Sequence, residues 1–259
     1  MISKNKILKT VKPDISHLFA AASGGSDILF NWVPIEIPVG CVELRSLFFT
    51  LIGIDGSTGN NADLDIYFAT GIDGVAPADL TAHAGSSATI AATFRRNLIG
   101  YAFIDASETV INGDTTYNIY QAGGKSDSAD YVGDGGFTIF LQGEPHATRT
   151  GFQTIYMTAL AHGAAQDYGT EVDLNMAASA NVDADTTGAS VTLTTTGTDP
   201  RLVFQPGDAV IGHTGTVEME VVSVDSATQM KVKNISAQID HAEQLILKNP
   251  IEFRLGLEY

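Results

Sequence analysis

Cysteine is nearly absent from this sequence, which has Cys41 as its one thiol in 259 residues. A single cysteine excludes an intrachain disulfide framework. Because Cys41 lies among the apolar residues Val39, Val42 and Leu44, we expect a buried core thiol and not a nucleophile. The first residues lack the apolar stretch of a signal peptide, so we expect a protein made and folded in a reducing cytoplasm.

Long apolar runs and charged side chains are also scarce. The chain has no run of about 18 apolar residues, so we predict no membrane span. Charged residues make up 17% of the sequence, against roughly 25% in typical domains. Glycine, threonine, serine and alanine take their place. This composition removes long polar helix formers and adds turn formers, so it favours strands and loops.

Positive charge is the scarcest of all, with 14 basic residues against 30 acidic ones and a net charge of −16. An acidic body repels phosphate, so we predict no nucleic-acid binding. Four lysines lie in the first twelve residues, which contain no acidic residue: Lys4, Lys6, Lys9 and Lys12. We predict a flexible basic arm over residues 1–27, with these lysines contacting an acidic neighbouring subunit. A solvated, frayed terminus is the alternative.

Motifs that carry chemistry are missing from the sequence. It has no G-x-S-x-G elbow, no P-loop and no G-x-G-x-x-G after a strand. The six histidines show no metal-ligand spacing. Asp55, Asp63 and Asp65 offer oxygen ligands for calcium but do not match the D-x-D-x-D-G loop, so solvated hairpin turns are the alternative. We therefore predict a protein that is not an enzyme and needs no cofactor.

Short apolar runs closed by glycine-rich turns fill residues 28–165. About seven or eight such runs are typical of an antiparallel β-sandwich of the jelly-roll kind. Pro34 and Pro38 have no N–H to donate, so the first run is predicted to be an edge strand or an extended lead-in. Residues 88–104 are ambiguous by periodicity, but their aromatic and β-branched content favours a strand. Five tyrosines that border glycine-rich loops are candidate contact residues, with core or rim packing as the alternative: Tyr101, Tyr117, Tyr120, Tyr131 and Tyr168.

The composition changes after the sandwich. Residues 166–190 are acidic and rich in small side chains, which predicts a connector. Residues 191–259 then predict a small SH3-like barrel of about five strands, with 216–224 and 229–235 joined by a tight polar loop. The last run, from Ile251, places Phe253 on an apolar face. We expect this strand to pair back to the sandwich or to meet a partner. We also expect a homo-oligomer, a trimer, with the small barrel or the sandwich edge at the contact and Phe253 as an interaction residue.

Two stretches resemble virion structural proteins of tailed bacteriophages, especially marine ones. The first is VPIEIPVGCVELRSLFFTLIGIDG at 33–56, followed by LDIYFATGIDGVAPADL at 64–80. The second, FQPGDAVIGHTGTVEMEVVSVDSATQMKVKNIS at 204–236, is similar to barrel modules of phage capsid and tail components. The resemblance rests on β architecture, so it carries over no functional residue. It implies a capsid decoration or cement protein on the outer surface of the virion, with the major capsid protein or other virion subunits as partners.

Two other functions remain open from the sequence. A tail or fibre component fits the same resemblance. A sugar- or receptor-binding sandwich would use tyrosine and tryptophan platforms with aspartate and asparagine in a shallow groove. A hydrolase would instead need a pocket with convergent carboxylates of raised pKa, and the acidic residues here fall in turns.

Overall fold

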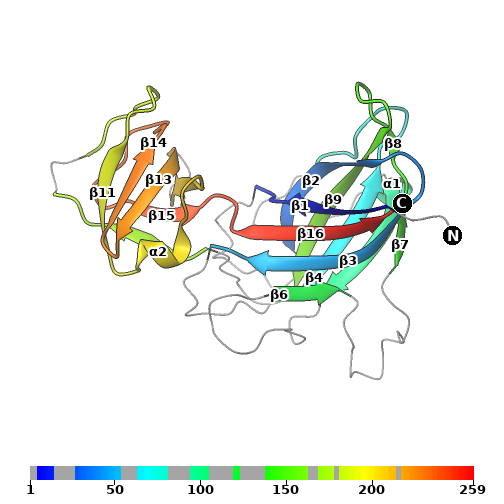
Figure 1. The fold of residues 1–259 in the computed structure, drawn as a ribbon, viewed down its shortest axis with the longest axis horizontal. Helices are drawn as coiled ribbons and strands as arrows, with labels where there is room; N and C mark the ends of the chain where they lie inside the picture. The colour runs from blue at the N-terminus through cyan, green and yellow to red at the C-terminus, as the bar shows by residue number, and fades with distance from the viewer. Residues whose placement is uncertain are drawn as a thin grey trace, which may run out of the picture.

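The computed structural model describes residues 5–14, 27–53, 63–80, 94–104, 119–122, 138–162, 169–177, 181–213 and 217–259. Within these ranges the chain forms sixteen strands and two four-residue helices (Figure 1). The predicted all-β class is therefore confirmed. No helix in the described ranges is long and apolar enough to cross a membrane.

Two antiparallel five-stranded sheets build what we call the first unit. The first sheet has the strand order β1-β16-β3-β6, and β7 pairs with β3. Its strands are β1 (Lys6–Val11), β16 (Ile251–Glu258), β3 (Val42–Leu51), β6 (Ile119–Ala122) and β7 (Ile139–Leu141). The strand nearest the C-terminus thus lies between the strand nearest the N-terminus and β3.

The second sheet has the order β2-β9-β4-β5, and β8 pairs with β9. Its strands are β2 (Asp27–Pro38), β9 (Phe152–His162), β4 (Asp63–Thr70), β5 (Leu98–Ile104) and β8 (Glu144–Pro145). The prolines are correctly predicted to mark an edge, since β2 is the outermost strand. The strand predicted over 88–104 is wrong at Phe94–Asn97, which forms the helical turn α1 ahead of β5.

One apolar core joins these two sheets. Alternate residues of the second half of β3 point inward, where Leu47, Phe49 and Leu51 are buried. Phe30 of β2 contacts Phe253 of β16, with ring centroids 5.6 Å apart. The same buried cluster contains residues of both sheets. The first unit is therefore held by side chains that meet between the sheets.

The second unit is a closed six-stranded barrel with the order β10-β11-β14-β13-β12-β15. Its strands are β10 (Val172–Leu174), β11 (Val191–Thr196), β14 (Gln229–Lys233), β13 (Glu218–Ser226), β12 (Ala209–Gly212) and β15 (Gln244–Leu247). The circle closes because β15 pairs with β10. A separate core fills it, and the helix α2 (Pro200–Val203) starts at the N-cap Asp199.

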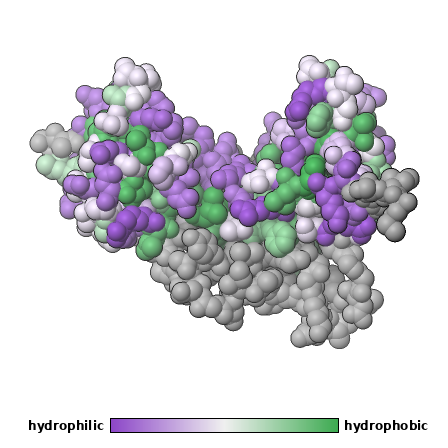
Figure 2. All heavy atoms as spheres, in the orientation of Figure 1, coloured by the Kyte–Doolittle hydropathy of each residue, from purple (hydrophilic) through white to green (hydrophobic). Residues whose placement is uncertain are grey.

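The barrel is an insertion in the chain of the first unit, between β9 and β16. At the junction, the Ile52 N–H donates to the Pro250 carbonyl at 2.8 Å, and the Thr170 N–H donates to the Gly53 carbonyl at 2.8 Å. A Cβ on Gly53 would lie 2.8 Å from the Pro250 Cβ, so the backbones approach too closely for a side chain. Figure 2 shows the two units as lobes with hydrophilic residues over much of both.

Two sequence-based boundaries need correction. The flexible arm is wrong for residues 6–11, because β1 pairs along its length with β16 and buries Val11. The connector over 166–190 already contains β10, a strand of the barrel. With β10 included, the barrel has six strands, whereas about five were predicted. Both strands pair with segments distant in sequence, which local composition does not reveal.

Cys41 is also placed differently from the prediction. It is exposed, just before β3, whereas Val42 and Leu44 are buried. The inward positions of β3 start at Val42, so the thiol falls outside the alternation. Apolar neighbours in sequence therefore did not make it a core residue.

Candidate functional site

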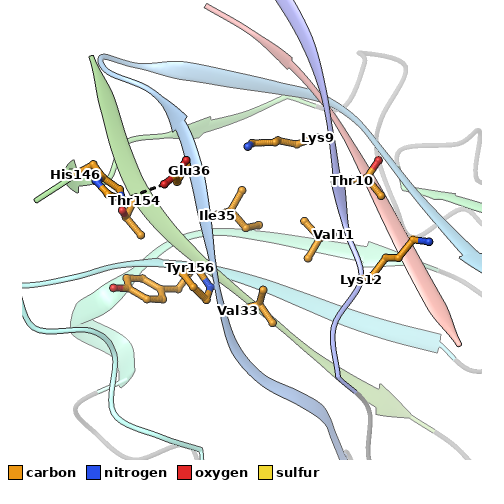
Figure 3. A pocket seen from close by; sticks show the side chains of 11 residues that line it. Lys9, Thr10, Val11, Lys12, Val33, Ile35, Glu36, His146, Thr154 and Tyr156 are labelled. Atoms are coloured by element: carbon orange, nitrogen blue, oxygen red, sulfur yellow. Dashed lines mark ion pairs between the residues drawn. The ribbon is translucent and has the colours of Figure 1, made fainter. Parts of the chain in front are cut away.

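A pocket of about 610 Å³ lies where the edge strands of the two sheets, β1 and β2, come together (Figure 3). Its apolar part comes from Val11, Val33 and Ile35, which belong to the core or pack against it. Its polar part comes from both strands and from the neighbouring segments of the second sheet. The remaining lining residues are Lys9, Thr10, Lys12, Pro34, Glu36, His146, Thr154 and Tyr156.

The β1 side of this groove has an open backbone edge. Asn5 and Tyr259 exchange two backbone hydrogen bonds of 3.0 Å each. In an antiparallel pair such positions recur at every second residue, so Ile7 and Lys9 direct their backbone groups to β16. The N–H and C=O groups of Leu8 and its alternate neighbours therefore point away from β16. No strand of the described ranges pairs with that side of β1.

On the β2 side, Glu36 is held by two basic residues. The His146 Nε2 lies 3.0 Å from a Glu36 oxygen, and Arg149 forms an ion pair with the other oxygen. The His146 Nδ1 accepts hydrogen bonds from the N–H groups of Thr148, at 3.2 Å, and Arg149, at 3.1 Å. Nδ1 is thus engaged by these two backbone N–H groups, and Nε2 is the ring nitrogen that faces the Glu36 carboxylate.

The lysines of β1 make the groove a basic feature of an acidic protein. Lys9 points across the pocket toward Glu36 (Figure 3), and it forms no ion pair with the described part of the chain. Lys12 points away from the pocket centre and lies 3.4 Å from Glu252. Glu36 is already neutralised by Arg149, so the charge of Lys9 remains as a local excess of positive charge.

Neither catalysis nor metal binding is indicated by the groove's chemistry. It contains no serine or cysteine beside a base, and its one carboxylate is ion-paired. In the described ranges, no group of three His, Cys, Asp or Glu residues could hold a metal ion. What the groove offers is an open backbone edge, an apolar floor and a positive charge, which together suit an extended anionic ligand.

The predicted site residues fall into different places. Lys6, Lys9 and Lys12 lie on or directly after β1, while Lys4 is outside the described residues. Phe253 is wrong as a contact residue, because it is 0% exposed and its ring centroid lies 5.2 Å from that of Phe49. The sheet to which β16 returns covers the apolar face that was expected to need a partner.

The calcium candidates do not come together as a described cluster. Asp55 and the side chain of Asp63 lie outside the described residues. Asp65 accepts a hydrogen bond of 2.5 Å from the Tyr101 hydroxyl and one of 3.5 Å from the Tyr67 hydroxyl. The calcium site therefore stays an untested prediction, and Asp65 is seen as a partner of tyrosines.

These tyrosines form a second cluster, on the outer face of the second sheet. Tyr67 of β4 and Tyr101 of β5 are cross-strand partners whose ring centroids are 5.3 Å apart. Tyr101 is 49% exposed. Burial, and then the negative charge of Asp65, raise the pKa of Tyr67. The two hydroxyls held by one carboxylate fix an aromatic surface that can pack against a ligand.

Sequence reasoning missed Glu36 and His146, which line the groove, and Arg149, which forms an ion pair with Glu36. They meet because β2 pairs with β9, next to β8 and the turn that follows it. Only the pairing register brings Glu36 opposite this turn, so the sequence carries no local signal for the cluster. The proline-marked edge was the one available hint that this region borders a sheet.

Comparisons with known proteins give little further information. No family model matches the chain, and no curated protein matches it. Among solved structures, a chain of the infectious bursal virus-derived T=1 particle is 10% identical, with a TM-score of 0.16. The match covers 98% of this chain and 40% of that one, so the present chain spans less than half of its length. A likeness at this TM-score carries no argument about fold or function.

Proposed function

We propose that the chain is a non-enzymatic structural protein of a virus particle, a capsid decoration protein on the outer surface of a tailed-phage capsid. The observation that carries the proposal is the β1–β2 groove: within the described residues it combines a sheet edge without a paired strand and a lysine, Lys9, without an ion pair, on a chain of net charge −16. Such a surface suits assembly with another protein and offers no chemistry to a substrate.

The architecture and composition support this proposal. We interpret the two sheets that share a core as a jelly-roll-like sandwich, and the barrel as a small SH3-like module. A high negative charge keeps free subunits apart and soluble before assembly. Small polar side chains lose little conformational entropy when an interface forms. These are properties that a protein bound in many copies to a particle requires.

The proposed partners are the major capsid protein or other virion subunits, and the protein acts in the virion after synthesis in the host cytoplasm. We also propose that it forms a homo-oligomer, a trimer, without nucleic acid or membrane. Because Phe253 is buried, it is no longer the proposed contact. Analytical ultracentrifugation at tens of micromolar tests the oligomer, and a monomer there would leave association with the capsid as the only assembly route.

Immunogold electron microscopy tests the decoration role directly. An antibody raised against the purified chain is applied to intact particles of the tailed phage that encodes the chain under this proposal. We expect labelling over the capsid. Labelling confined to the tail or fibres would replace the decoration role with that of a tail or fibre component. Unlabelled particles, with the chain also absent from their peptide mass spectra, would overturn the virion proposal.

A second candidate, a carbohydrate- or receptor-binding module, is favoured by the tyrosine cluster. Tyr67, Tyr101 and Asp65 combine aromatic rings with a carboxylate acceptor on an outer sheet face, a combination that binds sugars by packing and hydrogen bonding. A glycan array tests it, with Tyr101→Ala beside the unchanged chain. A saturable hit lost in the variant supports it. No hit, or a hit that Tyr101→Ala does not change, contradicts a role for this cluster.

A further inference from the structure

We propose that the open edge of β1 binds an extended segment of a separate, acidic partner protein as an additional strand of the first sheet. The inference concerns the groove of the proposed function and names the chemistry of its partner. The inference requires the open backbone edge of β1 and the positive charge of Lys9, and it holds whether or not the partner is a capsid protein. A negative peptide-binding result would therefore contradict this inference alone, and unlabelled particles would contradict the proposed virion role alone.

The backbone of β1 provides the directional part of this recognition. The N–H and C=O groups of Lys6, Leu8 and Thr10 point away from β16, as the pairing of Asn5 with Tyr259 establishes. An extended chain can pair with these groups in the way that one strand pairs with the next. These three alternate residues define a site about five residues long, which a heptapeptide covers with one residue to spare at each end.

The opposite edge of the groove is less suited to a new strand. Pro34 and Pro38 lie in β2, and neither has an N–H to donate. A strand added to β2 would therefore meet gaps in its ladder. The added strand is assigned to β1, with β2 as the wall against which its inward side chains lie.

Side chains of β1 determine what the added strand should carry. Leu8 is 62% exposed on the outer face of this edge strand. An apolar side chain of the partner would cover it. On the inner face Lys9 points into the pocket, so an acidic side chain of the partner would lie beside its ammonium group.

The charge distribution of the molecule supports an acidic partner. The barrel's lysines are neutralised within the chain: Lys231 lies 3.0 Å from Asp225, and Lys233 lies 2.8 Å from Glu220. Lys9 has no such ion pair in the described ranges. The positive charge of Lys9 is therefore available to an incoming carboxylate. Its attraction acts at short range, against the repulsion from a chain with net charge −16.

A peptide titration tests the proposal on the full chain. The probe is a fluorescein-labelled, end-capped heptapeptide of alternating valine and glutamate, followed by fluorescence anisotropy at low ionic strength. A valine–lysine heptapeptide is the charge control. The same acidic peptide with a central proline is the backbone control. We expect saturable binding of the acidic peptide, weaker by about tenfold or more for either control, since each loses an ion pair or a backbone hydrogen bond.

Protein variants separate the two contributions. Leu8→Pro removes an N–H that points away from β16 and leaves the β1–β16 ladder intact, so we expect about tenfold weaker binding. Lys9→Gln should weaken binding several-fold at low salt and much less at high salt. Lys231→Gln, which makes the same change of charge on the barrel, should have no effect. If Leu8→Pro lowers the melting temperature, the proline peptide and Lys9→Gln still decide the question.

Three results would overturn the proposal. The first is no saturable binding of the acidic peptide. The second is equal binding of the acidic, basic and proline-containing peptides, which would indicate unspecific attachment. The third is self-association of the free chain that Leu8→Pro abolishes, because the edge would then belong to a second copy and not to a separate partner.

Discussion

In the barrel each strand from β10 to β15 has a hydrogen-bonded neighbour on both sides, whereas the two sheets of the first unit end in edge strands, β1 and β2 at one end of their strand orders and β6 and β5 at the other. Both units are β structures with apolar cores of their own. They differ in what they leave unpaired. A closed barrel has no free edge, so the strand edges that stay unpaired within the described ranges belong to the first unit.

The inserted barrel and the open unit also differ in how the chain completes them. The barrel lies within one continuous segment, and its first and last strands are paired with each other. The first unit is incomplete until β16, which follows the barrel in the sequence, pairs with β3. We therefore expect the barrel to fold by itself. The first unit should form only when the segments that enter and leave the barrel meet at the junction.

The largest expected effect comes from placing a charge in one core at a time. Phe253→Asp leaves a cavity worth about 3–5 kcal/mol and adds the cost of a buried charge, so the first unit should unfold. The barrel transition should remain. Leu193→Asp, at a residue 0% exposed in the barrel core, should do the reverse. Differential scanning calorimetry distinguishes them, and one shared transition lost in both variants would contradict two separate cores.

The junction gives the next largest effect. Gly53→Ala places a Cβ 2.8 Å from the Pro250 Cβ and 3.1 Å from the Leu247 Cβ. Such overpacking costs about 1–3 kcal/mol. Gly169→Ala is the matched control, because its Cβ would meet Ile246 at an ordinary 3.8 Å. Chemical denaturation measures both changes, and equal stabilities would show that the junction is not closely packed.

The strand that was expected to be a flexible arm can be tested by a pair of alanine substitutions. Val11→Ala removes two methyl groups from the core and should cost about 1–2 kcal/mol. Leu8→Ala, on the exposed face of the same strand, should change stability by less than about 0.5 kcal/mol. Urea unfolding measures both, and two negligible effects would restore the interpretation of a free arm.

How much of this the sequence predicts depends on where each strand finds its partner. The hairpin of β13 and β14 was predictable, since both strands and their loop are adjacent in sequence. The edge position of β2 followed from its prolines. By contrast, β1 has the sequence KILKTV, in which polar and apolar residues do not alternate, and it becomes a strand because β16 lies beside it. The Glu36–His146 contact likewise depends on register between distant segments.

The smallest expected effect is a pH dependence within the barrel. Burial raises the pKa of Asp208, against the Gln205 N–H and the charge of Lys12, which lower it. A raised pKa in the folded state contributes stability at low pH that is lost as the pH rises through that pKa. Asp208→Asn should therefore slightly raise the barrel Tm at neutral pH and leave it unchanged below the ordinary aspartate pKa.

Asp199 should give the barrel a pH dependence of stability opposite to that of Asp208. Hydrogen bonding to Arg201 lowers the pKa of Asp199, so its contribution to stability is present at neutral pH and lost as the pH falls through that pKa. Asp199→Asn should lower the barrel Tm at neutral pH and leave it unchanged in acid. Thermal melts at both pH values check the pair. The same direction of change in both variants would contradict the assignment.

Residue-resolved amide hydrogen exchange, followed by NMR on the free chain, tests the contrast between open edge and closed barrel most directly. The account predicts alternation along β1, with slow exchange at Ile7, Lys9 and Val11 and fast exchange at Lys6, Leu8 and Thr10. It predicts no strand of the barrel with an unprotected outer edge. Uniform protection along β1, or alternating protection in a barrel strand, would contradict it.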